Sequence, residues 1–258
     1  MDKNFKTKKQ FGQHLLISKD VITKIVDTLE IEECDILIEI GVGTGYLTQE
    51  ILSNNLSMVY GIEIDQTAYP IIEEKFKDYR NFELIKADFF DVDLQSLIDD
   101  RKVKFTGNLP YNVASNIIIR TVYFLRNIKL SVFMVQKEVA EKIIAKPRTK
   151  DYTFFSVFIQ TFYKPEYIMS VPARFFHPPP KVTSGVIKLI PKENIQITDI
   201  DDYKEFLSKL FQNRRKMLRT KINPELLKQV DINPESRIEE IDLQQILKLY
   251  EVVKSGNR

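Results

Sequence analysis

The chain has 258 residues, with 38 Lys and Arg against 36 Asp and Glu, and its 43% hydrophobic content is enough for one α/β domain with a small appendage. The single cysteine excludes a disulfide within the chain and a cysteine-rich metal site, and His14 and His177 are too far apart to form a metal-binding motif. Residues 1–6 lack the apolar segment of a signal peptide, and no uncharged apolar run could span a membrane, so we expect a soluble, cytoplasmic protein.

Helix and strand patterns alternate over the first half of the chain. Residues 18–29 carry apolar side chains at helical spacing, and Ser18 stands where it could cap that helix. The apolar run 35–40 predicts a buried strand, which leads into a glycine loop and a helix over residues 46–52. Further apolar runs predict strands at 58–62, 82–86, 103–107 and 131–135, and a helix at 137–145. This alternation predicts an α/β fold with a doubly wound, mostly parallel sheet.

The second half of the chain predicts a hairpin followed by short helices instead of alternating strands and helices. Residues 166–171 and 183–190 predict a closing hairpin whose long connection contains Pro178-Pro179-Pro180. Pro191 marks the expected end of the sheet domain. Three short helices are predicted beyond it, at 203–211, 224–230 and 243–253. We therefore expect a domain of residues 1–191 and a small helical domain of residues 192–258.

The glycine loop Gly41-Val42-Gly43-Thr44-Gly45 is the first candidate binding element. A strand, a glycine loop and a helix in this order form the first unit of a nucleotide-binding sheet. The dinucleotide fingerprint requires a further glycine at position 46, where this chain has Tyr46, and there is no Lys-Ser/Thr pair of a P-loop. An adenosine-containing ligand without phosphates therefore fits better than NAD or ATP, although the loop could also be only a tight turn.

Two acids follow the next two predicted strands. Glu63 ends the strand that follows the glycine loop, and an acid about 20 residues beyond such a loop can bind both ribose hydroxyls. Asp88 follows the third strand and could accept the amine of the cofactor's adenine. Its alternative role is a helix N-cap, for which Asp91 and Asp93 compete.

The segment Asn108-Leu109-Pro110-Tyr111 follows the fourth strand and suits one chemical task. The Asn108 side-chain carbonyl can accept one hydrogen of an amino group, and the backbone carbonyl of Pro110 the other. The nitrogen lone pair of a base amine would then be steered towards a methyl donor. Tyr111 offers a flat face on which that base could stack. The alternative is an ordinary strand-ending turn, in which Asn and Pro are common.

Positive charge is concentrated in two places. Lys3, Lys6, Lys8 and Lys9 lie at the amino end. Five further cations lie within eight residues, and on a helix they would share faces: Arg214, Arg215, Lys216, Arg219 and Lys221. Contacts with nucleic-acid phosphates are one interpretation of this cluster, and a solvated helix face is the other.

Taken together, the motifs resemble the S-adenosylmethionine-dependent RNA adenine dimethyltransferases. The matching elements are Glu39-x-Gly41-x-Gly43-x-Gly45, Glu63, Ala87-Asp88 and Asn108-Leu109-Pro110-Tyr111. Residues 11–16 resemble that family's amino-terminal cofactor lid, and residues 176–184 its second aromatic motif. The resemblance runs from about Lys8 to the carboxyl end. His14 stands where the family often has Asn, and Val42 where Pro or Ala is frequent.

The resemblance implies a fold, a cofactor and a set of site residues. The fold would be the Rossmann-like class I methyltransferase fold, with a seven-stranded sheet and a small C-terminal helical domain. S-adenosylmethionine would be the cofactor, with no metal. The residues implied to bind it are His14, Leu16, Gly41, Gly43, Glu63, Asp88 and Asn108. The residues implied at the reacting amine are Asn108, Pro110, Tyr111 and Phe176, with Phe175 as the alternative to Phe176.

The carboxyl-terminal part points to one branch of that family. Residues 213–216 and 232–237 are similar to the branch that dimethylates two adjacent adenosines near the 3′ end of small-subunit ribosomal RNA. The implied partners are that RNA and the immature small ribosomal subunit, bound by a monomer through Arg214, Arg215, Lys216 and Arg219. Three alternatives stay open: a non-catalytic factor that checks assembling subunits, a nicotinamide oxidoreductase, which Tyr46 disfavours, and a methyltransferase of large-subunit RNA.

Overall fold

A computed structural model of the protein describes residues 14–256. The chain forms two compact units, one of residues up to 140 with 165–191, and one of residues 141–164 with those from 192 onward. This division differs from the expected boundary at residue 191 alone. Helix α7 (Phe154–Phe162) accounts for the difference, because it packs against α8 (Ile200–Phe211) and α10 (Leu243–Gly256) of the C-terminal region.

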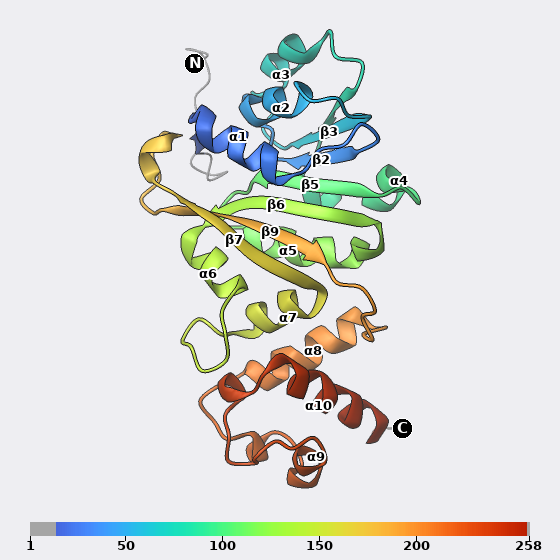
Figure 1. The fold of residues 1–258 in the computed structure, drawn as a ribbon, viewed down its shortest axis with the longest axis vertical. Helices are drawn as coiled ribbons and strands as arrows, with labels where there is room; N and C mark the ends of the chain where they lie inside the picture. The colour runs from blue at the N-terminus through green and yellow to red at the C-terminus, as the bar shows by residue number, and fades with distance from the viewer. Residues whose placement is uncertain (1–13, 257–258) are drawn as a thin grey trace. The chain divides into compact units, whose positions relative to one another are not determined.

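The first unit is built on a seven-stranded sheet in the order β4-β3-β2-β5-β6-β9-β7 (Figure 1). The first five strands in chain order pair in parallel: β2 (Ile36–Ile40), β3 (Met58–Glu63), β4 (Phe82–Lys86), β5 (Val103–Asn108) and β6 (Ile128–Gln136). Strand β9 (Ser184–Pro191) pairs antiparallel with β6, and β7 (Tyr163–Val171) lies at the edge beside it. The expected mostly parallel, doubly wound sheet is confirmed.

Helices cover both faces of this sheet. On one face, α1 (Lys19–Thr28), α2 (Tyr46–Leu52) and α3 (Tyr69–Phe76) bury their apolar sides against strand residues such as Leu37, Val59 and Val132. On the other, α5 (Ala114–Thr121) lies behind the sheet and buries Ile117 and Ile118 (Figure 1). Helices α4 (Leu94–Ile98) and α6 (Lys137–Ile143) complete the α/β alternation. Ser18 precedes α1 as expected, but its side chain makes no capping hydrogen bond.

The order of the strands determines where a ligand can bind. From β2 the chain proceeds to β3 and β4 on one side, and then returns to β5 and β6 on the other side of β2. The loops that follow β2 and β5 therefore diverge and leave a crevice at the carboxyl ends of these strands. Gly107 permits the two strands to approach there, because a Cβ at this position would collide with the carbonyl oxygen of Ile40.

Short elements complete the first unit. The two-residue strand β1 (Leu15–Leu16) pairs antiparallel with β8 (Phe176–His177), which brings the start of the described chain beside the second aromatic motif. Three 3₁₀ helices are η2 (Phe89–Asp91), η3 (Val122–Asn127) and η4 (Ala173–Phe175).

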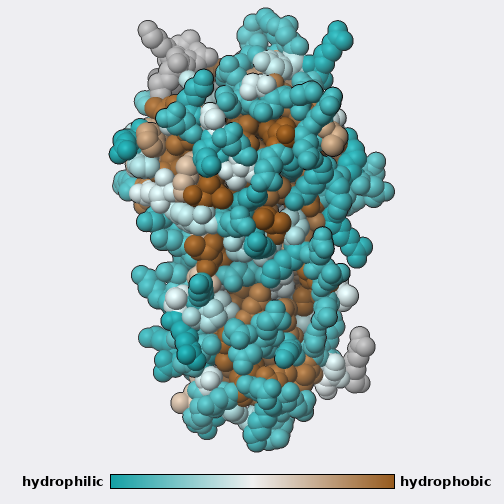
Figure 2. Space-filling view, in the orientation of Figure 1, coloured by the Kyte–Doolittle hydropathy of each residue, from teal (hydrophilic) through white to brown (hydrophobic). Residues whose placement is uncertain are grey.

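The second unit is helical and has an aromatic core. Besides α7, α8 and α10 it contains α9 (Pro224–Gln229) and the 3₁₀ helices η5 (Leu218–Thr220) and η6 (Ile238–Glu240). Tyr203 is fully buried, lies edge-on to Phe162 and Tyr250, and its hydroxyl is 2.9 Å from that of Thr161. Hydrophilic residues cover most of the face drawn in Figure 2. Across residues 14–256 no helix is both long and apolar enough to cross a membrane.

Candidate active site

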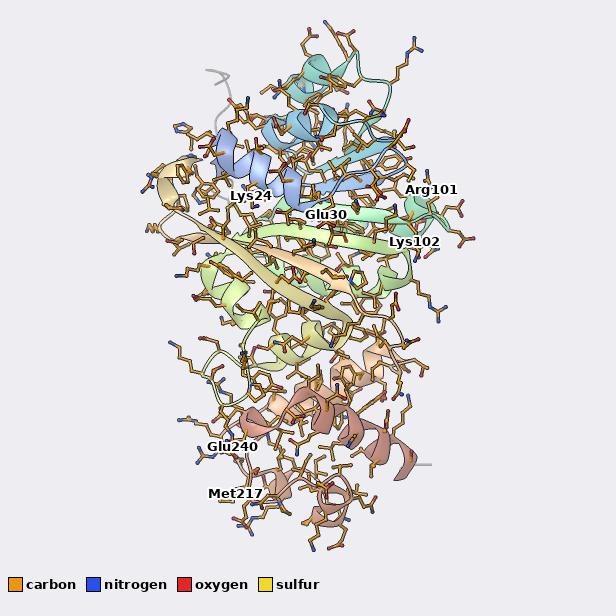
Figure 3. The ribbon with its side chains drawn as sticks, viewed as in Figure 1. Lys24, Glu30, Arg101, Lys102, Met217 and Glu240 are labelled. Atoms are coloured by element: carbon orange, nitrogen blue, oxygen red, sulfur yellow. The ribbon has the colours of Figure 1, made fainter. Side chains whose placement is uncertain are left out.

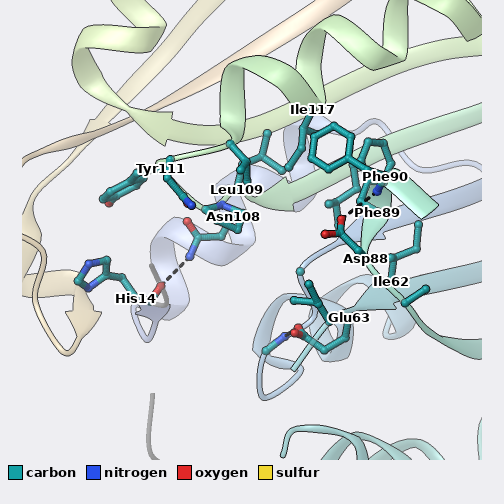
Figure 4. A pocket seen from close by; sticks show the side chains of 18 of the residues that line it. His14, Ile62, Glu63, Asp88, Phe89, Phe90, Asn108, Leu109, Tyr111 and Ile117 are labelled. Carbon is teal, nitrogen blue, oxygen red and sulfur yellow. Dashed lines mark hydrogen bonds between the residues drawn. The ribbon is translucent and has the colours of Figure 1, made fainter. Parts of the chain in front are cut away.

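A pocket of about 240 Å³ opens at the switch point of the sheet. Residues at the ends of four successive strands line it: Gly41 and Gly43 after β2, Glu63 on β3, Asp88 after β4 and Asn108 on β5. Figure 4 shows Glu63, Asp88 and Asn108 around this pocket. Its described lining contains two carboxylates and neither Lys nor Arg. Such a lining disfavours a phosphate-bearing ligand and favours one that carries positive charge and hydrogen-bond donors.

Glu63 lies where a ribose-binding acid is expected. Its side chain is only 4% exposed, and it accepts hydrogen bonds from the backbone N–H groups of Gly43 at 2.7 Å and Asp65 at 2.8 Å. Burial raises the pKa of this carboxyl, while the two hydrogen bonds act in the opposite direction. The Gly43 bond also ties the glycine loop to β3. Glu63 therefore has a fixed position at the pocket wall.

A second buried acid, Glu39, lies beside a small adjoining cavity of about 40 Å³. Burial raises its pKa to about 8, and the Thr48 hydroxyl donates a hydrogen bond to it at 2.6 Å. Leu16 lines this cavity rather than the main pocket, together with glycines 41 and 43. From the sequence, Glu39 is recognisable only as part of the glycine motif, and no local pattern signals a separate role for it.

Asp88 takes the N-cap role that the sequence offered as one of two interpretations, and it also lies in the lining of the pocket. Its Oδ1 accepts the N–H of Phe90 at 2.9 Å and so caps η2, while the residue also lines the pocket. Asp93 caps the following helix, α4, by accepting the N–H of Ser96. One oxygen of Asp88 is thus used for the cap, and the other is the one that could face an adenine amine.

Asn108 is held in a defined orientation. Its Nδ2 donates to the carbonyl oxygen of His14 at 2.7 Å, drawn as a dashed line in Figure 4. An amide donates through nitrogen and accepts through oxygen, so this bond leaves Oδ1 as the group available to a substrate amine. The position of His14 thus supports the predicted function of Asn108 through a backbone group. Residues 11–13 of the lid motif lie outside the described residues.

The expected role of the Pro110 carbonyl needs correction. This oxygen accepts the N–H groups of Val113 at 3.1 Å and Ala114 at 2.9 Å, which begins helix α5. Both of its lone pairs are therefore engaged. If Asn108 holds a substrate amine, the second acceptor would be a different carbonyl of the loop between Asn108 and Tyr111.

Two contacts fix the Tyr111 side chain, one at its hydroxyl and one on a face of its ring. Its hydroxyl lies 2.6 Å from the hydroxyl of the fully buried Ser184 on β9. The His14 ring stacks on it, with centroids 5.6 Å apart and planes 28° apart, and His14 Nδ1 bonds the carbonyl oxygen of Pro178 at 2.8 Å. Sequence reasoning missed Ser184 as a support for Tyr111, and no local pattern signals a contact between residues so distant in sequence.

Phe176 does not stand where the sequence-based expectation placed it. Its side chain is 2% exposed and packs in the hydrophobic core with residues such as Leu16 and Val186. Neither Phe176 nor Phe175 is among the residues that line the pocket. The β1–β8 pairing explains this, because it holds Phe176 against the core side of Leu16. Of the three candidate stacking rings, Tyr111, Phe175 and Phe176, only Tyr111 lines the pocket.

The basic segment belongs to the second unit and is not a helix. Residues 212–215 form turns and Lys216 lies in a bend, with Asn213 at a φ of 54°, so these residues do not form the helix face that was one interpretation of the cluster. Arg214 donates to the carbonyl of Lys150 at 2.8 Å and contacts Glu239 at 3.4 Å, which gives it a structural role. Arg215 and Lys216 are exposed. Figure 3 shows the neighbouring Met217, which is 37% exposed.

Arg219, the fourth residue expected to bind RNA, lies in η5. Its side chain is 51% exposed, and its Nε is 3.4 Å from Glu235, whose side chain is 57% exposed. An ion pair this open to water contributes little to stability, typically about 0–1 kcal/mol. The cation can therefore exchange its partner for a phosphate at small cost.

Comparison with known proteins agrees with this geometry. A family model described as ribosomal RNA adenine dimethylase matches residues 4–255. The ribosomal RNA small subunit methyltransferase A of Persephonella marina is 59% identical over 249 residues, which cover 96% of this chain and 94% of that protein. The protein of the same name from a Sulfurihydrogenibium species is 57% identical over 254 residues and 98% of each chain. The crystal structure of a dimethyladenosine transferase from Plasmodium falciparum superimposes with a TM-score of 0.84 at 27% identity, covering 94% of this chain and 98% of that one.

The doubly wound sheet with an acidic pocket at its switch point, together with the family match, identifies the protein as an S-adenosylmethionine-dependent methyltransferase. Within that class, the chain belongs to the ribosomal RNA adenine dimethylase family.

Proposed function

We propose that the protein transfers two methyl groups to the N6 amine of each of two adjacent adenosines near the 3′ end of small-subunit ribosomal RNA. The observation that carries this proposal is the orientation of Asn108, whose amide nitrogen is bound by the His14 carbonyl so that its oxygen can hold an amine. The small-subunit methyltransferases that share more than half of the sequence support the choice of RNA.

The residues present fit S-adenosylmethionine. The pocket offers Glu63 to the ribose hydroxyls, Asp88 to the adenine amine and the loop after Gly41 to the methionine part. Glu39 lies near this loop as a buried acid that could face the cofactor's ammonium group. The bound cofactor would supply an electrophilic methyl group on a positively charged sulfur, and the lining residues that the structure describes include no Lys or Arg to repel that charge.

The protein's own contribution to the reaction is mainly orientation. Oδ1 of Asn108 and a second carbonyl of its loop would accept hydrogen bonds from the amine, which turns the nitrogen lone pair towards the methyl group. The amine gains positive charge as it is methylated and loses its proton afterwards, so no strong general base is required. Holding the two reacting groups in line can supply most of the acceleration.

The target base would be held by stacking. An adenine inside folded RNA has to leave its stack before its amine can reach the pocket. Tyr111 is the ring that the pocket presents, and Ser184 fixes its hydroxyl. Because His14 covers one face of Tyr111, we expect the base either to use the opposite face or to displace the imidazole.

Recognition of the RNA would involve the second unit. Arg215, Lys216 and Arg219 are exposed cations on one short segment, suited to phosphate contacts. Arg214 would support that segment from within. We propose the immature small subunit as the natural substrate, bound by a monomer in the cytoplasm.

The test is incubation of the protein with a labelled methyl donor and with isolated small or large ribosomal subunits that lack this modification, followed by nucleoside analysis. We expect N6,N6-dimethyladenosine in small-subunit RNA alone. Label in large-subunit RNA would favour the large-subunit alternative. Tight binding of small subunits without any methyl transfer would favour a non-catalytic assembly factor.

A thermal melting assay checks the cofactor independently of RNA. S-adenosylhomocysteine at 100 times its dissociation constant should stabilise the fold by about 2.7 kcal/mol, and NAD should have no effect. Stabilisation by NAD alone would refute the assignment of the pocket.

A further inference from the structure

Arg120, on helix α5, forms hydrogen bonds to the turn that follows Asp88. Its two terminal nitrogens donate to the carbonyl oxygens of Phe89 at 2.6 Å and Val92 at 2.7 Å. Phe89 is the first residue of η2, and Val92 follows its last residue. The guanidinium fork therefore holds both ends of this short 3₁₀ helix, a geometry that a single ammonium group could not reproduce.

The Arg120 guanidinium also contacts the aromatic rings of this turn. The guanidinium carbon lies 5.1 Å from the ring centroid of Phe89 and 5.9 Å from that of Phe90, within the range of cation–π attraction. The two rings meet edge to face at 5.8 Å, and both residues line the pocket (Figure 4). Arg120 itself is not part of the lining, so any effect on a ligand passes through this turn.

The two Arg120 hydrogen bonds connect two walls of the pocket, helix α5 and the η2 turn. Ile117 lies one turn before Arg120 on α5 and lines the pocket from the side of β5, whereas η2 follows β4. Among residues 14–256, the Asp88 side chain makes one hydrogen bond, its own cap bond to Phe90. The turn is also held by the burial of Phe89 and Val92, and the two Arg120 hydrogen bonds tie its backbone to the wall formed by α5.

We propose that Arg120 is a positioning residue that holds the Asp88 turn where the carboxylate can select adenine over 6-oxopurines. This inference rests on the proposed role of Asp88 at the cofactor's adenine. The 6-amino group of adenine donates to a carboxylate, whereas the 6-oxo group of hypoxanthine presents an acceptor and is repelled. Such discrimination requires the carboxylate to stay in place, which is what the two Arg120 bonds provide.

The experiment measures the dissociation constants of S-adenosylhomocysteine and S-inosylhomocysteine by titration calorimetry, in the full-length protein. We expect the wild-type protein to prefer the adenine ligand by about 10-fold or more, the effect of one hydrogen bond to a charged group. Arg120→Met removes both bonds while keeping an extended side chain, and the preference should fall towards equal binding. Arg120→Lys can satisfy one carbonyl at a time, so its preference should be intermediate.

The ratio of the two affinities separates positioning from general stability. Loss of packing alone would weaken both ligands equally, so the ratio would stay at the wild-type value. Arg126→Met removes one exposed arginine from the adjoining η3 helix and should leave the ratio unchanged. If Arg120→Met does not fold, the Arg120→Lys ratio decides the question.

The outcomes distinguish three failures. A wild-type preference that persists in the folded Arg120 variants would overturn the role of Arg120 alone. Equal binding of both ligands by the wild-type protein would overturn the role of Asp88 and this inference with it. Absence of S-adenosylhomocysteine binding by the wild-type protein would overturn the proposed function.

Discussion

Replacement of Asn108 by alanine tests the proposed amine-holding group most directly. Within the part of the chain that the structure describes, the side chain makes one hydrogen bond, from Nδ2 to the His14 carbonyl, and its oxygen is assigned to the substrate. The amine acquires positive charge in the transition state, so the lost substrate bond is one to a charged group, worth roughly 1.5–3 kcal/mol. This corresponds to a fall in the rate of methyl transfer of about 10–150-fold.

The same substitution has a smaller, separable effect on the cofactor. Loss of the neutral hydrogen bond to His14 weakens the attachment of His14 and the adjoining strand β1 by roughly 0.5–1.5 kcal/mol, so cofactor affinity should fall by no more than about 10-fold. The rate of methyl transfer should therefore fall more than cofactor affinity. The second methylation should respond differently from the first, because a monomethylated amine has only one hydrogen left to hold.

The assay is a single-turnover reaction on small subunits that resolves mono- from dimethyladenosine, accompanied by calorimetry with S-adenosylhomocysteine. Asn116→Ala, an equal truncation at an exposed position of α5, is the matched control and should behave as wild type. Wild-type rates for both steps in the Asn108 variant, with normal subunit binding, would refute the reasoning and return Asn108 to the role of a turn residue.

Four further predictions follow from the site and the second unit. Glu63→Ala should raise the dissociation constant of S-adenosylhomocysteine by roughly 10-fold or more, since it removes hydrogen bonds from a charged acceptor; unchanged affinity by calorimetry in a folded variant would exclude the ribose role. Ser184→Ala should leave cofactor affinity intact but slow methyl transfer by about 2- to 10-fold, because it removes the hydrogen bond that fixes the Tyr111 ring. A Tyr111→Phe variant should lose the same factor in rate, and the double variant should lose no more than either single variant. Additive rate losses in kinetic assays would argue against a shared role of the two hydroxyls. Burial raises the pKa of Glu39 from 4.5 to about 8, so its contribution to stability is fully present below pH 4.5 and is lost as the pH rises through 8. In denaturant unfolding of the cofactor-free protein, the free energy of unfolding should therefore depend less on pH in Glu39→Gln than in the wild-type protein. Identical pH profiles would mean that Glu39 titrates normally. Changing Arg215 and Lys216 to Gln should reduce the slope of log affinity against log salt for small-subunit binding by about 0.7–0.9 per phosphate contact, whereas changing Lys209 and Lys228 should not; equal slopes in both double variants would support the solvated-surface interpretation.

Local patterns were sufficient to predict the framework of the site. The runs 35–40, 58–62, 82–86 and 103–107 all form strands, and the glycine loop, Glu63, Asp88 and Asn108 follow or end them at one edge of the sheet. This succeeded because periodicity and turn residues act within a few positions of the chain. Parallel strands then bring their carboxyl ends together without any further information.

Contacts between distant residues were decided only by the tertiary structure. The sequence does not reveal that Ser184 meets Tyr111, that Phe176 turns into the core, or that Arg214 supports the loop before α7. The inclusion of residues 141–164 in the second unit has the same origin, because α7 buries its aromatic side chains against helices 40 or more residues away. Burial and pairing of this kind depend on which helices and strands pack together in the folded protein, and a short segment of sequence does not determine its distant neighbours.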